Sequence, residues 1–311
     1  MVWRGLAWCA GGTFFVLALA NTPIALAAES GSALYIGGSQ AFGAGATPPP
    51  GTYGTIGTIY YDGNVGAVVA GGLVDLNVRK KAFASVANLL HVWPGGIAGG
   101  RFGVSASLPF ASYANLTATA AGAVTGNLQT DGWGIGDLSL KAQNGWSHGS
   151  FSHTVSVTMW APTGRYDTGF SPNAGKNHVG FDFGWAFTQI WANPGIELSM
   201  SLGYSVELEN PATSYRNGDT FHLEAALGYK THSGWTLGAA SYLIYQVTGD
   251  SGSGALLGPF RREVYAAGPA LSYSGVIAGK AFNLTARHYW EFDARNTFEG
   301  HISFVTGTVK F

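Results

Sequence analysis

The sequence predicts an all-β fold: a transmembrane, antiparallel, up-and-down β-barrel of about 12 strands that follows a cleaved signal peptide. Charged residues make up only 11% of the 311 residues, less than half of the roughly 25% that soluble domains carry. Glycine (47 residues) and aromatic residues (14%) are abundant. Apolar residues alternate with polar ones instead of forming long runs, which is the pattern of a strand with one side in lipid.

The balance of charge excludes other classes of protein. There are 16 basic residues against 17 acidic ones, so the chain has no basic field with which to hold nucleic acid. Disordered chains combine low hydrophobicity with high net charge, and this chain has neither property. Its glycines show no three-residue period, which excludes collagen.

Residues 1–27 have the features of a secretory signal peptide. Arg4 supplies a positive charge, 14–20 form a short apolar region, and Ala25-Leu26-Ala27 matches a cleavage site. An uncleaved N-terminal anchor is the alternative. The only cysteine, Cys9, lies within this peptide, so we expect a mature chain without disulfides.

Residues 28–52 form a separate segment that is rich in glycine and proline. Its run Pro48-Pro49-Pro50-Gly51 is incompatible with a central strand. The segment is either a periplasmic tail or a plug folded into the lumen, and the sequence leaves both places open.

Residues 53–311 are predicted to form the barrel. In Ile196–Glu209 every even-numbered residue is apolar, a pattern that a strand buries on one face and a helix does not. The predicted strands lie near 53–61, 83–93, 102–108, 136–146, 155–159, 179–187, 196–209, 221–229, 235–247, 262–274, 282–292 and 298–311.

Short and long connections alternate along this region. Short ones are expected at 94–99, 147–148, 191–195, 231–234 and 275–280, and long ones at 62–82, 111–135, 163–177, 210–218 and 249–261. Outer-membrane barrels have short periplasmic turns and longer outer loops. The pattern therefore predicts the outer membrane of a Gram-negative bacterium. Tryptophans near strand ends fit the aromatic girdles of such a barrel: Trp93, Trp146, Trp160, Trp191 and Trp235.

Ionisable residues fall on the polar face of the predicted strands, opposite the apolar stripe. They are Arg101, Glu197, Glu207, His222, Glu224, Lys230, Arg287, Glu291 and Asp293. Two interpretations stay open. The residues either fill a narrow lumen with a network of salt bridges that stabilises the wall, or they form a polar lining that sets permeation.

Several motifs resemble those of a known family. They include Arg101-x-Gly103-x-Ser105, Trp160-x-Pro162-Thr163-Gly164-x-Tyr166-Asp167, Asn210-Pro211-Ala212-Thr213-x-Tyr215, Gly218-Asp219-x-Phe221-His222, Thr248-Gly249-Asp250-Ser251-Gly252 and Glu291-Phe292-Asp293-Ala294-x-Asn296. Together they resemble the meta-pathway phenol-degradation family of outer-membrane β-barrel proteins. The resemblance implies a barrel associated with the catabolism of aromatic compounds. The Ala-rich stretch 118–126 departs from it, and no defined site residues carry over.

The leading functional hypothesis is a porin-like channel for passive uptake of small hydrophobic or aromatic compounds, without enzymatic activity. One alternative is a structural or surface-binding barrel with a plugged lumen and no transport. Another is an outer-membrane lipid hydrolase, because His148-Gly149-Ser150 places a His and a Ser two residues apart. The motif Gly145-Trp146-Ser147-His148-Gly149 lies at a predicted hairpin turn and lacks the strand–turn–helix context that a nucleophile needs.

The expected partners follow from this hypothesis. They are membrane lipid and lipopolysaccharide, the barrel-assembly machinery through the C-terminal Phe311, and small hydrophobic or aromatic solutes, with no nucleic acid. No cofactor or metal is expected. The pair His222-x-Glu224 is reminiscent of a zinc deaminase, but the mature chain has no cysteine to hold the metal.

Overall fold

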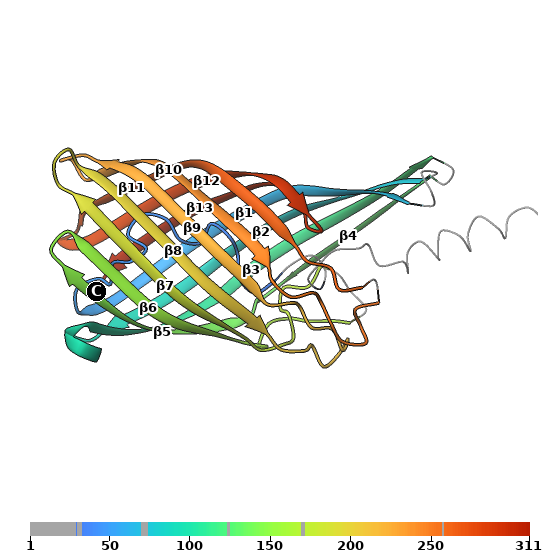
Figure 1. The fold of residues 1–311 in the computed structure, drawn as a ribbon, viewed down its shortest axis with the longest axis horizontal. Helices are drawn as coiled ribbons and strands as arrows, with labels where there is room; N and C mark the ends of the chain where they lie inside the picture. The colour runs from blue at the N-terminus through green and yellow to red at the C-terminus, as the bar shows by residue number, and fades with distance from the viewer. Residues whose placement is uncertain (1–28, 30–32, 70–73, 123–124, 169–171, 257) are drawn as a thin grey trace, which may run out of the picture.

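The chain forms a closed antiparallel barrel in the computed structural model, which describes residues 29, 33–69, 74–122, 125–168, 172–256 and 258–311 (Figure 1). Its strands are β1 (Gly51–Val69), β2 (Val74–Val92), β3 (Arg101–Gly122), β4 (Gly126–Gly134), β5 (Leu138–His148), β6 (Phe151–Ala161), β7 (Gly180–Trp191), β8 (Ile196–Glu207), β9 (Thr220–Lys230), β10 (Trp235–Gln246), β11 (Glu263–Ile277), β12 (Lys280–Arg295) and β13 (Glu299–Lys310). β13 pairs with β1 and closes the wall. Closure matters because hydrocarbon offers no partner to an unpaired backbone group.

Thirteen labelled strands occupy twelve positions in the wall. β3 pairs with β5 near its start, from Arg101 to Ser107, and with β4 farther along, from Ser112 to Ala120. β4 and β5 follow each other along the chain and are separated only by residues 135–137. They are two parts of one interrupted strand, so the predicted 12-strand barrel is confirmed.

The two ends of the barrel differ in their connections. Residues 149–150, 192–195, 231–234 and 278–279 make tight turns at one end, where a single 3-10 turn, Ile97–Gly99, lies between β2 and β3. We call this the short-turn end; the C-terminus lies there (Figure 1). The opposite, long-loop end carries the connections 162–179, 208–219 and 247–262. Within the described ranges, no helix is long and apolar enough to cross a membrane.

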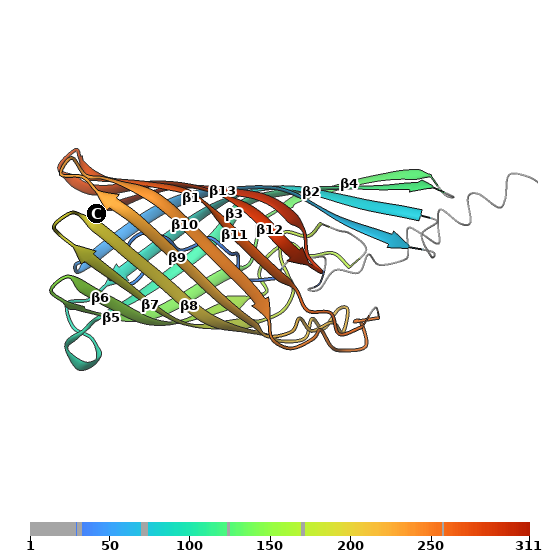
Figure 2. The same cartoon turned by 45° about the horizontal axis from the view of Figure 1, so that its top comes forward.

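Two predicted long loops are wrong. Residues 62–82 and 111–135 were expected to be loops, but β1, β2, β3 and β4 continue through most of them and pair with one another beyond the barrel (Figures 1 and 2). The cause is physical: past the membrane neither face of these strands meets lipid, so nothing selects an apolar side. Their small Gly, Ala and Thr residues therefore carry no alternation that would reveal a strand.

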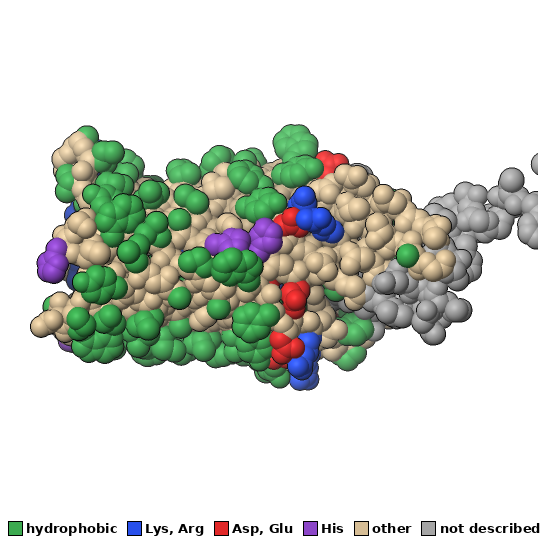
Figure 3. Space-filling model, turned by 90° about the horizontal axis from the view of Figure 1, so that it is seen from above, with side chains coloured by type: hydrophobic (Ala, Val, Ile, Leu, Met, Phe, Trp, Pro, Cys, Tyr) green, Lys and Arg blue, Asp and Glu red, His purple; other side chains and the backbone are tan. Residues whose placement is uncertain are grey.

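The outer face of the barrel is apolar. Figure 3 shows hydrophobic side chains over the wall, and acidic and basic side chains gathered toward the long-loop end. Exposed outward residues include Ile56, Leu89, Leu140, Val157, Phe183, Leu237, Leu284 and Val305, with Trp93, Trp191 and Trp235 near the short-turn end. At the long-loop side, Asp62 is paired with Arg79 at 2.7 Å between the nearest nitrogen and oxygen. This apolar band with a charged border is the surface that a bilayer requires.

Candidate functional site

The lumen contains residues 33–50, which we call the threaded segment. Just before it, the Glu29 backbone N–H donates to Asn217 Oδ1 at the long-loop end, at 2.7 Å. Near its other end, Thr47 Oγ1 lies 3.0 Å from Thr154 Oγ1 of β6, and β1 begins at Gly51 at the short-turn end. The threaded segment thus passes along the interior from one end to the other, as the blue trace inside the barrel shows (Figure 1).

A row of wall side chains holds the backbone of the threaded segment. Three carboxylates accept its N–H groups: Glu207 from Leu34 at 3.0 Å, Glu224 from Gly38 at 3.1 Å and Gln40 at 2.5 Å, and Glu197 from Gly43 at 2.7 Å. The Thr188 hydroxyl accepts from Gly45 at 3.0 Å. An irregular segment has no ladder of its own for these N–H groups, so the carboxylates satisfy the backbone and are themselves satisfied by it.

Two glycines allow the threaded segment to lie close to the wall. Gly38 has a φ of +81°, a left-handed conformation that side chains disfavour. A Cβ atom at Gly45 would collide with the backbone of Phe187 on β7. Glycine is therefore required here for contact with the wall, and not only for flexibility.

A buried histidine supports the middle of the threaded segment. The His222 ring stacks on the Tyr35 ring, with centroids 3.5 Å apart and planes 16° apart. Its Nε2 lies 2.7 Å from Asp182 Oδ1, and Ser205 donates to the same oxygen at 2.7 Å. The Tyr35 hydroxyl donates to Glu224 at 2.7 Å. This cluster joins β7, β8 and β9 to the threaded segment through side chains alone.

A second histidine joins the long-loop end to the same system. His178 Nε2 lies 2.8 Å from Glu207 Oε2, and Asn217 donates to that oxygen as well. Burial alone would lower the pKa of His178, but the hydrogen bond to Glu207 and the negative charge of its carboxylate outweigh burial, so the pKa is raised. Glu207 therefore ties two loops and the threaded segment to the end of β8.

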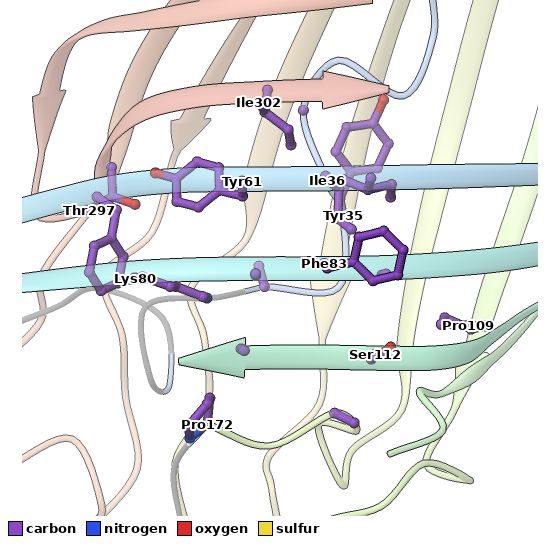
Figure 4. A pocket seen from close by; sticks show the side chains of 18 of the residues that line it. Tyr35, Ile36, Tyr61, Lys80, Phe83, Pro109, Ser112, Pro172, Thr297 and Ile302 are labelled. Carbon is purple, nitrogen blue, oxygen red and sulfur yellow. The ribbon is translucent and has the colours of Figure 1, made fainter. Parts of the chain in front are cut away.

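An apolar cavity of about 310 Å³ lies between the threaded segment and the wall, toward the long-loop end (Figure 4). Its lining includes Tyr35 and Ile36 of the threaded segment and Ile59, Tyr61, Ala82, Ala84, Val86, Ile244, Val264, Phe298 and Ile302 of the wall. Tyr61 and Tyr242 both donate to Glu291, at 2.8 and 2.6 Å. Lys80 Nζ lies 5.5 Å from the centre of the Phe298 ring. The cavity offers an apolar enclosure with a few polar groups, which suits a small organic molecule.

A polar cavity of about 560 Å³ adjoins it. Hydroxyl groups from the inner faces of β3, β5 and β6 line it: Ser105, Ser107, Ser139, Thr154, Ser156 and Thr158, with Lys141 among them. The two cavities share the lining residues Ala33, Tyr35, Ile36, Ile59, Val86, Pro109, Ala174 and Lys176. The two cavities are therefore neighbours inside the barrel, bordered by the same residues of the threaded segment and the wall.

Comparison with known proteins agrees with this architecture. A family model described as "Putative MetA-pathway of phenol degradation" matches residues 61–303. The chain belongs to this family. Comparison with curated proteins gives no match.

A solved outer-membrane structure shares the fold of this chain. An outer membrane channel from Pseudomonas putida F1 superimposes with a TM-score of 0.63 at 14% identity, covering 86% of this chain and 97% of that one. The β domain of a Bordetella autotransporter gives a TM-score of 0.43 at 12% identity, covering 84% and 100%. The channel shows that a barrel of the same fold exists as a separate outer-membrane protein.

Most of the sequence-predicted site residues of this family member meet inside the barrel. Glu197, Glu207, His222 and Glu224 are buried against the threaded segment, and Glu291 lines the apolar cavity. The remaining residues lie elsewhere. Lys230 Nζ is 2.9 Å from Glu197, and Arg287 donates to the backbone oxygen of Ser39 at 3.1 Å. Arg101 donates to Ser147 at the short-turn end, and Asp293 is exposed at the long-loop rim.

Four residues that matter in the lumen were missed. Lys141 lies on a strand whose alternation is weak, and Asp182 occurs between aromatic residues, where it looked like an ordinary inward polar residue. Tyr35 is in the segment whose place the sequence left open, and Arg262 falls at the edge of a loop. In the strand register Lys141 and Asp182 both lie opposite Thr158, an inward-facing residue of β6, so both point into the lumen.

One predicted girdle residue is wrong. Trp160 lines the polar cavity with Thr158 and Ser156, on the inner face of β6. A position near a strand end does not determine which face a side chain takes. Even-numbered residues of β6 face inward, so Trp160 points into the lumen and not toward lipid.

The residues behind the lipid-hydrolase hypothesis lie at the short-turn end. His148 ends β5 and Ser150 is in the following turn, where its Oγ accepts a hydrogen bond from Gln189 at 2.8 Å. Among the described residues, no three His, Cys, Asp or Glu side chains are grouped so as to hold a metal ion. No observation at this turn favours the hydrolase hypothesis.

Proposed function

We propose that this protein is a passive channel in the outer membrane of a Gram-negative bacterium, through which small hydrophobic or aromatic compounds enter the cell. The observation that carries the proposal is the pair of adjacent cavities inside a barrel with an apolar outer face. Membership of a family described by phenol degradation supports it. So does the fold that the chain shares with an outer membrane channel.

The two cavities suggest a sequence of steps. A ring entering from the long-loop side gains free energy in the apolar cavity, at about 25 cal/mol for each Å² of apolar surface that leaves water. It then passes the residues that border both cavities, which include Ile59 and Val86 of the wall and Ile36 of the threaded segment. Beyond them lies the polar cavity, which hydroxyl groups and Lys141 line. The threaded segment narrows the lumen, so passage is limited to small molecules.

The proposed surroundings follow from the outer face. Its apolar band would lie in membrane lipid, and its charged border at the long-loop end would meet lipopolysaccharide. The exposed Phe311 at the end of β13 is available to the barrel-assembly machinery. Small hydrophobic or aromatic solutes would be the transported partners.

A variant with a bulky side chain at a residue that lines both cavities tests the channel. Val86→Trp would fill the space that the two cavities share, whereas Leu89→Trp on the same strand points to lipid and is the matched control. Uptake of labelled phenol is measured in cells lacking the protein and in cells carrying each form. We expect wild type and Leu89→Trp to restore uptake and Val86→Trp to leave it at the level of the deletion. Equal uptake with and without the protein would remove the transport role.

A plugged structural barrel is the second candidate, and one observation favours it. The three carboxylates that hold the threaded segment are the kind of attachment that a permanent plug would have. Planar-bilayer recordings distinguish the two: a channel conducts, whereas a permanently plugged barrel shows no conductance under any applied voltage.

A further inference from the structure

Arg262 is a buried cation inside the barrel, at the edge of the loop that precedes β11. It is 8% exposed, and Val264, two residues later and therefore on the same side of the chain, is buried as well. Both residues line the apolar cavity. The Arg262 Nε and Nη2 atoms have no hydrogen-bond partner in the part of the chain that the structure describes.

Nearby carboxylates do not bind this guanidinium among the described residues. Glu207 and Asp250 are the acidic groups whose charge reaches Arg262. Glu207 instead accepts from His178, Leu34 and Asn217, and Asp250 from Tyr215, Gly218 and Gln246. Neither forms an ion pair with Arg262 among the described residues. A buried charged donor without a partner is costly, and such a group marks a place where a ligand can supply the missing acceptor.

The two free nitrogen atoms have a geometry that matches one class of ligand. Nε and Nη2 lie on the same edge of the guanidinium and point in the same direction, so together they hold the two oxygens of a carboxylate. This chain contains an example: Arg79 donates from Nε and Nη2 to the two oxygens of Asp62, at 2.8 and 2.7 Å. A phenol hydroxyl has one oxygen and satisfies only half of this pair.

The surroundings of Arg262 favour an apolar body on that ligand. Ile244, Val264, Phe298 and Ile302 line the same cavity, which is large enough for one aromatic ring (Figure 4). Glu291 is the carboxylate in the lining, and it already accepts from Tyr61, Tyr242 and the Gly300 backbone. Lys80 and Lys176 also line this cavity.

We propose that Arg262 binds the carboxylate of a small aromatic acid whose ring lies in the apolar cavity. The proposal rests on the proposed function, because it names the class of compound that the channel would select. It adds that aromatic acids are held more tightly than neutral compounds with the same ring.

The test compares two probes on the purified full-length protein in detergent micelles. Benzoate carries a ring and a carboxylate, and benzyl alcohol carries the same ring without charge; binding of each is measured by titration calorimetry at pH 7. Arg262→Gln removes the charge and the paired donors. Arg262→Lys keeps the charge and loses the pair. Arg261→Gln removes the neighbouring exposed arginine and is the matched control.

Benzoate should bind the wild type more tightly than benzyl alcohol does. Arg262→Gln should weaken benzoate binding by about 10-fold or more, and Arg262→Lys by a smaller factor, while Arg261→Gln leaves it unchanged. Benzyl alcohol should bind all four forms alike. Heat-dependent migration in gels verifies that each variant retains a folded barrel.

Unchanged benzoate binding in Arg262→Gln would overturn the proposal, as would equal affinity of the two probes for the wild type. If benzyl alcohol still binds in that case, the cavity holds neutral compounds and the proposed channel stands without a carboxylate site. If neither probe binds any form, the apolar cavity is not a ligand site, and the uptake experiment at Val86 then decides on transport independently.

Discussion

Replacing Glu224 with glutamine should release the middle of the threaded segment. Glu224 is 1% exposed and accepts three hydrogen bonds, from the Tyr35 hydroxyl and from the backbone N–H groups of Gly38 and Gln40. Glutamine has a single acceptor oxygen, and its NH₂ group would face a donor. At least two of the three bonds to a charged acceptor are then lost or weakened, at about 1.5–3 kcal/mol each, which gives roughly 3–6 kcal/mol in total.

Hydrogen exchange followed by mass spectrometry measures this loss directly. Since about 1.4 kcal/mol corresponds to a factor of ten in an equilibrium constant, a loss of about 3 kcal/mol should make the amides of residues 37–41 exchange roughly 100-fold faster. Amides in the strands of the wall should exchange as in the wild type. In planar bilayers the same variant should conduct more current than the wild type, because the threaded segment obstructs less of the lumen.

Glu209→Gln is the control for the Glu224 variant. Glu209 is an exposed glutamate just past the end of β8, so its replacement changes the charge of the chain by the same amount without touching the threaded segment. If residues 37–41 of Glu224→Gln exchange as slowly as those of the wild type, the carboxylate does not hold the segment and the reasoning from these three bonds is wrong.

Three further predictions concern other parts of the molecule. Because the folded pKa of His178 is raised, its bond to Glu207 is fully stabilising below the ordinary histidine pKa of about 6.5 and is lost as pH rises through the raised value. The protection factor of the Leu34 amide, which compares its exchange with that of an unstructured amide at the same pH, should therefore fall with rising pH; a protection factor that stays constant or rises would contradict this. Gly45→Val should displace residues 40–48 of the threaded segment from the wall, because the valine side chain would occupy the place of the Phe187 backbone. Protease should then cleave residues 40–48 faster than in the wild type, and an unchanged cleavage rate would count against this. Val157→Arg, on the lipid face in the middle of β6, should destabilise the barrel in vesicles by about 2–4 kcal/mol, measured by urea unfolding; a change below 0.5 kcal/mol, roughly the size of a surface substitution, would mean that this face is not in lipid.

The membrane part of the wall was predictable because lipid imposes one rule on every strand. In Ile196–Glu209 each second side chain is apolar, and in Trp235–Val247 each second side chain except Ser241 is apolar. The structure has strands β8 and β10 there. The rule stops at the membrane surface. The continuation of β1 to Val69 and of β3 to Gly122 lies beyond it, and the sequence carries no signal for either.

The lumen was only partly predictable, for a different reason. Alternation indicates which residues point inward, so Glu197, Glu207 and Glu224 were found. It does not indicate what they meet. Their partners in the threaded segment are backbone N–H groups more than 150 residues away in sequence. Every residue except proline carries such a group, so the residue types do not reveal which ones are bound.

The long strands β1–β4 have a consequence beyond the apolar band. β3 has 22 residues, which at about 3.3 Å per residue gives a length of roughly 70 Å, against an apolar band of about 25 Å in such barrels. Even when tilted, these strands extend well past the apolar band at the long-loop end. In the orientation proposed above, they reach into the sugar layer and toward the medium. The projecting strands stand beside the opening of the barrel. An antibody, a phage or an inserted peptide tag could attach to them without entering the pore.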